Sequence, residues 1–295
     1  MRLLKDRIAR RLMQTLTCFS LLIIALMGVG LYYKSSGIIR VSSVWELLST
    51  SEWSPLAGKF GFLTFILSSV YVTVLAVALA LPVSLLTALY LTERAKSWVK
   101  KLVFPVLDIL AGIPSVVYGV WGILVIVPLI ADVLGPRFVD YTSGYSVLAG
   151  GVVLSVMIMP LLVSLFVEIF STVPRDFREA SLSLGATGWQ TSRRVVVRKA
   201  TPGIIAAVVL AISKAFGETL AVLMVCGNMV QPPHSLFDSC YPLPALIANN
   251  YGEMLSLPMY ESALMFAALV MFVIILIFNA LSRIILQRVE KSFKL

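Results

Sequence analysis

Long apolar stretches alternate with polar connections along this chain. Five stretches carry no charged side chain, and each exceeds the roughly 20 helical residues that cross about 30 Å of hydrocarbon. They cover residues 12–33, 60–92, 109–130, 141–167 and 262–282. A sixth, from about 202 to 226, spans a membrane only if it carries Lys214 and Glu218 inside it. The pattern predicts six transmembrane helices, and it lacks the alternation of a β-barrel.

Composition agrees with this pattern. Hydrophobic residues make up 59% of the 295 positions and charged residues only 13%. The mean hydropathy of +0.95 lies far above that of an average soluble domain. We therefore expect an all-α integral membrane protein.

The 24 Lys and Arg residues predict the topology. Most lie before the first apolar stretch, in the second and fourth connections and in the C-terminal tail: Arg2, Lys5, Arg7, Arg10, Arg11, Arg94, Lys96, Lys100, Lys101, Arg175, Arg178, Arg193, Arg194, Arg198, Lys199, Arg283, Arg288, Lys291 and Lys294. Only Lys34, Arg40, Lys59 and Arg137 lie in the alternate connections. Basic connections stay in the cytoplasm, so both termini are predicted to be cytoplasmic. The net charge of +9 is then a topology signal, with no nucleic-acid partner implied.

The first apolar stretch and the cysteines each leave an alternative open. The first stretch follows basic residues, as in a cleaved signal peptide, but its length and the lack of a small-residue cleavage site before Lys34 favour a retained helix. Cys18, Cys226 and Cys240 have no metal-like spacing. Cys226 and Cys240 could share the oxidising side, yet spacing alone does not establish the Cα separation that a disulfide needs, so a bridge is the less favoured option. His234 is interpreted as an ordinary loop residue.

Catalytic signatures are missing from the sequence. It has no G-x-x-x-x-G-K-[ST] phosphate loop, no H-E-x-x-H and no cysteine cluster. The ionisable residues expected within or beside the membrane are few: Asp108, Glu168, Lys214 and Glu218. We expect no catalytic residue and no metal site. An intramembrane enzyme is the second hypothesis and a passive membrane scaffold the third.

A polar segment interrupts the apolar pattern at residues 178–194, REASLSLGATGWQTSRR. Helix formers from about 176 to 184 follow Pro174, and Gly185 and Gly188 end that helix. A second helical piece begins near Trp189, and Pro202 is expected to begin the next span. Charge alone leaves two interpretations, a basic hairpin on anionic lipid or a docking site for a cytosolic partner.

The stretch EASLSLGATGWQTSRRVVVR resembles the EAA loop of ABC importer permeases. That loop reads E-A-A, three residues, Gly, nine residues and Ile-x-Leu-Pro. Glu179, Ala180 and Gly185 match it, Ser181 replaces the second Ala, and Arg198 replaces the Pro. The resemblance implies that this segment is a cytoplasmic coupling helix that inserts into an ATP-hydrolysing subunit.

Two further stretches narrow the resemblance. GIPSVVYGVWGILVIVP at 112–128 and ISKAFGETLAVLMVCGN at 212–228 are similar to the permeases of the bacterial Pst phosphate importers, and to their C-type subunits in particular. The resemblance covers about residues 65–285. It implies six helices in a type I ABC importer permease fold and the transport of inorganic phosphate, with another oxyanion (sulfate, molybdate or phosphonate) as the alternative.

The same resemblance implies partners and a domain plan. The partners are a related permease, two ATP-binding subunits and an external phosphate-binding protein, in a bacterial inner membrane, and this chain itself binds no cofactor. Residues 1–60 form the cytoplasmic N-terminus, the first helix and an outer loop. Residues 61–290 form the permease domain, with a coupling loop at about 171–201 and an outer loop at about 227–261. That loop contains five prolines and no Lys or Arg, so we expect it to be ordered and to receive the binding protein.

Lys214 and Glu218 are the predicted substrate-path residues. Four residues apart, they are expected on one helix face about 6 Å from each other. A charge at membrane depth costs at least about 2.5 to 3.5 kcal/mol unless it is paired or wetted, which indicates a site, although a structural ion pair is the alternative. Pst permeases usually have Arg where this chain has Lys214, so the resemblance supports electrostatic attraction of the anion more than bidentate coordination.

Overall fold

The computed structural model describes residues 2–252 and 259–293 and is almost entirely helical. Within these residues, six helical segments are long and apolar enough to cross a membrane, which confirms the predicted number. They are Ala9–Val41, Leu63–Glu93, Ser115–Phe138, Val147–Ser171, Gly188–Phe216 and Tyr260–Leu281.

The elements follow one another in a simple order. The first half contains α1 (Arg2–Val41), α2 (Val44–Ser49), the hairpin strands β1 (Trp53–Ser54) and β2 (Lys59–Phe60), α3 (Leu63–Glu93), α4 (Ser97–Gly112), α5 (Ser115–Trp121), the π-helical turns η2 (Gly122–Ile126) and η3 (Leu129–Leu134), and α6 (Gly135–Phe138). The second half contains α7 (Val147–Ser171), α8 (Arg175–Ser183), α9 (Gly188–Thr191), η4 (Ser192–Val196), α10 (Val197–Phe216), α11 (Leu220–Val225), α12 (Leu243–Asn250) and α13 (Tyr260–Phe293).

Close packing of α3 against α7 forms the centre of the larger core. A Cβ atom at Gly151 would lie 2.5 Å from Leu75 Cδ2, and one at Gly150 would lie 3.2 Å from Val72 Cγ1. Lipid offers no hydrophobic drive between membrane helices, so their contact depends on small residues that let two backbones approach. These two glycines therefore set the distance between α3 and α7.

The third span differs in its bounds from the predicted 109–130. A separate helix, α4, ends at Gly112, and α5 begins at Ser115 after Pro114, because the residue before a proline is disfavoured in the helical region. Asp108 consequently lies exposed on α4, outside the span. In the span, Gly119 packs closely against Met224 and Gly122 against Val153 and Val225, whereas Gly112 at the end of α4 has nothing within 4 Å of an added Cβ.

The fifth span also begins earlier than predicted. One continuous helical segment runs from Gly188 to Phe216, so Pro202 lies inside the helix. A proline removes only one donor to the preceding turn, and membrane helices tolerate that loss where neighbouring groups compensate. The second half of the predicted coupling segment is thus a continuous extension of a membrane helix.

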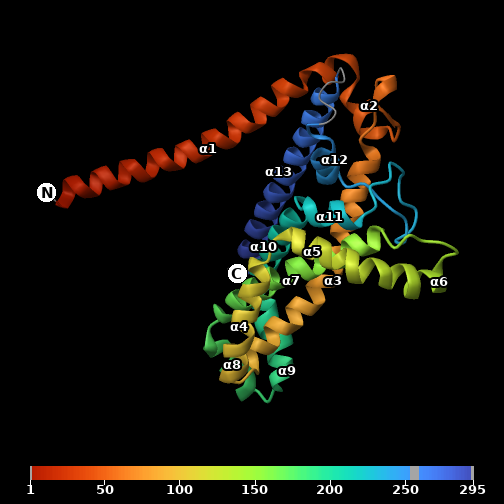
Figure 1. Ribbon diagram of the computed structural model, residues 1–295. Coiled ribbons are helices and arrows are strands. Elements are labelled where there is room, and N and C mark those ends of the chain that lie inside the picture. The colour runs from red at the N-terminus through yellow and green to blue at the C-terminus, as the bar shows by residue number, and fades with distance from the viewer. Residues whose placement is uncertain (1, 253–258, 294–295) are drawn as a thin grey trace.

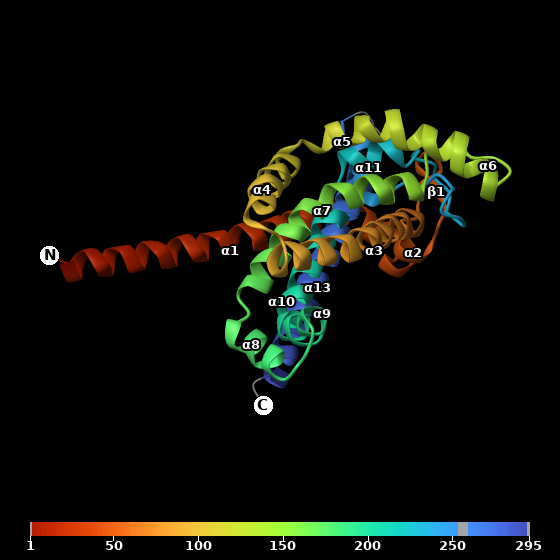
Figure 2. The ribbon, with the colours of Figure 1, turned by 90° about the horizontal axis from the view of Figure 1, so that it is seen from below.

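A second core joins the two ends of the chain. The C-terminal half of α1 packs along the start of α13, where Lys34 Nζ lies 2.7 Å from Glu261 Oε1 and Ser262 Oγ donates to the Lys34 carbonyl at 2.7 Å. The rest of α1 extends away from the body in two views (Figures 1 and 2). Its apolar side chains, such as Leu16 and Phe19, are exposed and available to lipid or to another subunit.

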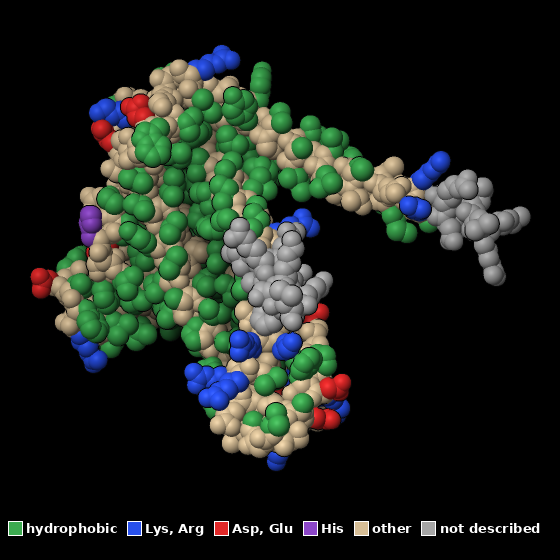
Figure 3. Space-filling model, turned by 180° about the vertical axis from the view of Figure 1, so that it is seen from behind, with side chains coloured by type: hydrophobic (Ala, Val, Ile, Leu, Met, Phe, Trp, Pro, Cys, Tyr) green, Lys and Arg blue, Asp and Glu red, His purple; other side chains and the backbone are tan. Residues whose placement is uncertain are grey.

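The connections between spans gather at two opposite ends. One end holds the α3–α4 turn and the segment containing α8 and α9, and charged side chains collect there in the space-filling view (Figure 3). The other end holds the β hairpin, the turn before α7 and the loop between α11 and α12. A mostly hydrophobic surface separates the two ends in this view, as a membrane-spanning body requires (Figure 3).

Candidate functional site

The coupling segment forms a short helix at the charged end. Its predicted extent of about 176 to 184 agrees with α8, Arg175–Ser183, which begins directly after Pro174. Asp176 lies in the first turn, where the helix dipole favours an acid. Glu179 and Ala180 lie exposed on α8, and Glu179 lines an open pocket together with Glu93 and Lys100.

Gly185 ends α8 in a Schellman motif. Its φ of +82° is a conformation that glycine adopts without steric cost. The Gly185 amide donates to the Leu182 carbonyl at 3.0 Å and the Ala186 amide donates to the Ser181 carbonyl at 3.2 Å, the two bonds that define this motif. A Cβ at Gly185 would meet nothing within 4 Å, so backbone conformation and not space accounts for glycine here.

The turn after Gly185 leads into a capped helix. The Gln190 amide donates to Thr187 Oγ1 at 3.3 Å, and Gln190 Oε1 accepts from the Thr187 amide at 2.9 Å, which is a complete capping box. The hydroxyls of Ser181 and Thr191 lie 3.0 Å apart and join α8 to α9. The helix–turn–helix predicted from the sequence is therefore correct and is internally braced.

The inward face of α8 is anchored to the membrane helices by Arg178. Its guanidinium donates to both carboxylate oxygens of Glu93 at the end of α3, with Nη2 lying 2.8 Å from Oε1. It also donates to the Phe170 carbonyl at 2.9 Å and to the Val173 carbonyl, both at the end of α7. The side chains of Arg178 and Glu93 are only 18% and 13% exposed, so this is a nearly buried, fully hydrogen-bonded pair.

A second inward contact reaches the fifth span. Lys199 Nζ lies 4.6 Å above the Phe177 ring, within the range of a cation–π interaction. Residues 177, 178 and 181 thus attach one face of α8 to α10, to α3 and α7, and to α9. Sequence reasoning missed Glu93 and Arg178, because nothing in the local pattern relates residues so far apart in the chain.

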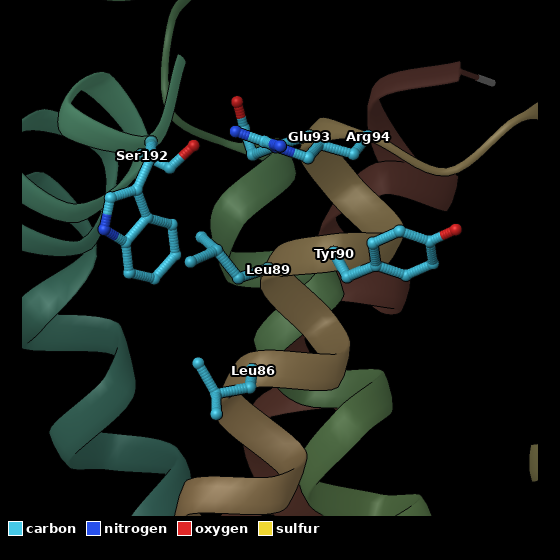
Figure 4. Close-up of a pocket in the computed structure, with 7 residues that line it drawn as sticks. Leu86, Leu89, Tyr90, Glu93, Arg94 and Ser192 are labelled. Carbon is cyan, nitrogen blue, oxygen red and sulfur yellow. The ribbon is translucent and has the colours of Figure 1, made fainter. Parts of the chain in front are cut away.

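An open pocket lies beside this anchor, between the end of α3 and the α9–η4 segment. It is lined by Leu86, Leu89, Tyr90, Glu93, Arg94, Trp189 and Ser192. Figure 4 shows Leu89 pointing toward the α9–η4 side and Tyr90 pointing away from it, with Glu93 and Arg94 at the polar end. The pocket combines apolar walls with one charged rim, formed by Glu93 and Arg94.

The predicted path residues lie at a break in the fifth span. Lys214 is exposed on the last turn of α10, which ends at Phe216, and Glu218 lies in the three-residue gap before α11. The prediction that both share one face of a continuous helix is wrong, because the helix stops at Gly217. Among the described residues the ion pairs are Lys34–Glu261, Lys59–Glu52 and Arg178–Glu93, so Lys214 and Glu218 form no salt bridge there.

Glu218 borders a small cavity between α3, α10 and the loop before α12. Ser69 and Thr73 supply polar groups to its wall. Its volume of about 10 Å³ approximates the space of a single water molecule. A tetrahedral oxyanion does not fit inside this cavity.

The loop between α11 and α12 is built onto the start of α7. The amides of Ser146, Val147 and Leu148 donate to the carbonyls of Val225, Asp238 and Leu236. His234 lies in this loop, where its amide donates to Asp238 Oδ2 at 2.9 Å. The described part of the predicted outer loop is thus ordered, and residues 253–258 of that loop lie outside the described residues. Within the described residues no group of His, Cys, Asp and Glu could hold a metal ion.

These features can be compared with known families. The family of binding-protein-dependent transport system inner membrane components matches residues 80–291. The chain belongs to this family. It is therefore a multi-pass membrane subunit of an ABC transporter, and the coupling segment and the break at Gly217 both lie inside the matched range.

Several curated members of the family are similar to nearly the whole chain. The probable ABC transporter permease protein YqgH of Bacillus subtilis is 37% identical and covers 96% of this chain and 92% of its own length. The phosphate transport system permease protein PstC of Haemophilus influenzae is 32% identical, over 95% and 93%. The probable PstC of Methanocaldococcus jannaschii is 33% identical, over 82% of each chain.

Solved permeases share the fold. A chain of a bacterial alginate ABC transporter, in complex with a periplasmic protein bound to alginate pentasaccharide, aligns with a TM-score of 0.60 at 16% identity, over 92% of this chain and 95% of that one. A chain of the inward-facing methionine transporter MetNI aligns with a TM-score of 0.54 at 19% identity, over 86% and 96%. The expected type I ABC importer permease fold is confirmed.

Proposed function

We propose that this chain is a permease subunit of an ATP-driven importer of inorganic phosphate. The observation that carries the proposal is the similarity, over most of the chain, to permeases named for phosphate transport. Permeases for sulfate, molybdate or phosphonate share the fold, and they are the alternative substrate class.

The translocation path is formed with a second, related permease. Lys214 is exposed on the surface of this chain, and the cavity beside Glu218 is too small for a phosphate. A path of sufficient width therefore needs the surface of a partner. The long exposed α1 is a further surface on which such a partner can pack.

Lys214 attracts the anion and Glu218 limits how tightly it is held. A cation at membrane depth lowers the energy of an anion in low dielectric, and a carboxylate beside the path opposes tight binding of that anion. The helix break at Gly217 separates the two groups, so each can contact the path independently. Lysine supplies charge without the fork geometry of arginine, which suits transient attraction.

The coupling helix α8 transmits the ATPase motion. Its exposed residues Glu179 and Ala180 dock into an ATP-binding subunit, and Arg178 anchors the helix to α3 and α7. ATP is hydrolysed by that partner, and this chain binds no cofactor. Two such subunits and an external phosphate-binding protein complete the complex.

The α8 end faces the cytoplasm of a bacterial cell, and both termini lie on that side of the inner membrane. The basic side chains gathered at this end support the orientation. The opposite end, with the loop between α11 and α12, receives the binding protein. A cysteine introduced at Ser235 or Asn250 is expected to crosslink to the binding protein from outside.

Reconstitution of the complex in liposomes tests the function. ATP-dependent uptake of radiolabelled phosphate, with sulfate as the matched oxyanion, is the expected result. Preference for sulfate would support the alternative substrate class. Absence of any flux in a complex that assembles and hydrolyses ATP would favour the passive scaffold.

A further inference from the structure

Two cysteines are brought together at the outer end of the molecule. The chain leaves α11 at Cys226 and returns to the same place at Cys240, where an isolated parallel bridge pairs Gly227 with Cys240. The Cys240 amide donates to the Cys226 carbonyl at 2.8 Å, and the Asn228 amide donates to the Cys240 carbonyl at 3.1 Å. These two bonds hold the backbones side by side at both cysteines.

The two cysteines lie in a closed part of the molecule. Both are fully buried, and both thiols are free in this structure. Gly150 of α7 makes room for the pair, since a Cβ there would lie 2.6 Å from Cys226 Sγ. Neither cysteine is therefore in contact with solvent in the folded protein.

We propose that Cys226 and Cys240 are joined by a disulfide in the assembled protein. This inference rests on the orientation given under the proposed function, which places the pair on the oxidising side of the membrane, where disulfides persist. The reaction is thiol–disulfide exchange with an external protein disulfide. The two thiols lose two protons and two electrons, one S–S bond forms between them, and the oxidant's S–S bond is reduced to two thiols.

The bond forms while the loop is still open. In the folded protein, the neighbouring Cys240 thiol and burial raise the pKa of the Cys226 thiol, which lowers its thiolate fraction. Full burial also keeps an external oxidant away. Oxidation therefore precedes the packing of the loop onto α7, and the finished bond is shielded from reductants.

The disulfide ties α11 to the outer loop between α11 and α12. Cys226 follows α11, which begins two residues after Glu218, and Cys240 ends the loop whose carbonyls accept from the first amides of α7. A covalent link at the base of this loop keeps α11, α7 and the loop in one arrangement. When the binding protein docks and the outer loop moves, α11 then moves together with the loop.

Counting thiols in the purified complex tests the proposal. The protein is denatured without reductant and alkylated with N-ethylmaleimide, then reduced and alkylated with iodoacetamide, and each cysteine is read by mass spectrometry. We expect Cys18 to carry the first label, and Cys226 and Cys240 to carry only the second. The first label on all three cysteines would overturn the proposal.

A stability measurement gives a second readout. Reductant present during unfolding should lower the thermal midpoint of the wild-type complex by several degrees and leave that of a Cys226→Ala/Cys240→Ala variant unchanged. Equal responses of the two proteins would contradict the proposal.

The orientation is tested separately from the disulfide. An Asn250→Cys variant, with the three native cysteines replaced by alanine, is treated with a membrane-impermeant maleimide in intact cells, and phosphate uptake is measured in the wild-type complex. If Asn250→Cys is labelled in intact cells but Cys226 and Cys240 of the wild-type protein are free thiols, the disulfide is wrong and the orientation stands. If Asn250→Cys is labelled only after lysis, the orientation on which the disulfide rests is wrong.

Discussion

The ion pair between Glu93 and Arg178 links α8, the helix proposed to dock into the ATP-binding subunit, to the membrane helices. Replacing Glu93 by Gln keeps the shape of the side chain but removes its charge. The guanidinium keeps its bonds to the Phe170 and Val173 carbonyls and loses the charge of its carboxylate partner. We expect α8 to separate from α3 more readily while the membrane helices remain folded.

The size of the effect follows from the burial of the pair. Removing one partner of a fully buried ion pair costs about 3–5 kcal/mol, and an exposed pair contributes at most about 1 kcal/mol. Glu93 and Arg178 are 13% and 18% exposed, so about 2 kcal/mol is a reasonable figure between these limits. That free energy corresponds to roughly a 30-fold shift in the local opening equilibrium of α8.

Hydrogen exchange of the amides in Arg175–Ser183 measures this shift directly. The Glu93→Gln variant should show roughly 30-fold faster exchange there, and proteoliposomes containing it should import less phosphate per ATP hydrolysed. Glu52→Gln is the matched control, because it breaks the exposed Lys59–Glu52 pair at the opposite end and should change neither quantity.

A double variant separates charge from shape. Replacing Arg178 by Met in the Glu93→Gln background removes the uncompensated buried charge, so part of the lost stability should return. If the α8 amides of the Glu93→Gln variant exchange at the wild-type rate, the reasoning is refuted. If they exchange faster while the phosphate imported per ATP hydrolysed stays at the wild-type value, α8 transmits the ATPase motion without this ion pair.

Three further predictions concern the path, the coupling turn and the packing. Lys214→Gln and Glu218→Gln should each abolish phosphate uptake in complexes that still hydrolyse ATP, and Lys214→Arg should retain it; uptake by Lys214→Gln would make the residue structural. Gly185→Asn should keep coupled transport because Asn tolerates positive φ, whereas Gly185→Val should lose it through strain of about 1–2 kcal/mol; equal activity of the two variants would argue against docking at this turn. Gly151→Leu should prevent assembly, seen as loss of the detergent-stable complex, whereas Gly112→Ala should not, and a stable Gly151→Leu complex would show that α3 and α7 can move apart.

The sequence by itself determined the class, the number of spans and the coupling segment. Charge-free runs longer than a membrane is thick define spans without reference to any contact, because the solvent for those residues is hydrocarbon. The helix ended by Gly185 was predictable for a similar reason, since a glycine that ends a helix at positive φ is a local requirement. The family's coupling motif, centred on Glu179, Ala180 and Gly185, is equally local.

Contacts between residues that are far apart in the chain were established only by the tertiary structure. The contact of Arg178 with Glu93, the meeting of Cys226 with Cys240 and the caps on α7 join segments whose separation along the chain leaves no periodic signal. The break at Gly217, which takes Glu218 off the helix of Lys214, likewise departs from the continuous helix that spacing implied. An apolar run limits a helix only loosely, because inside a membrane the packing of neighbouring helices, and not hydrophobicity, decides where a backbone bends.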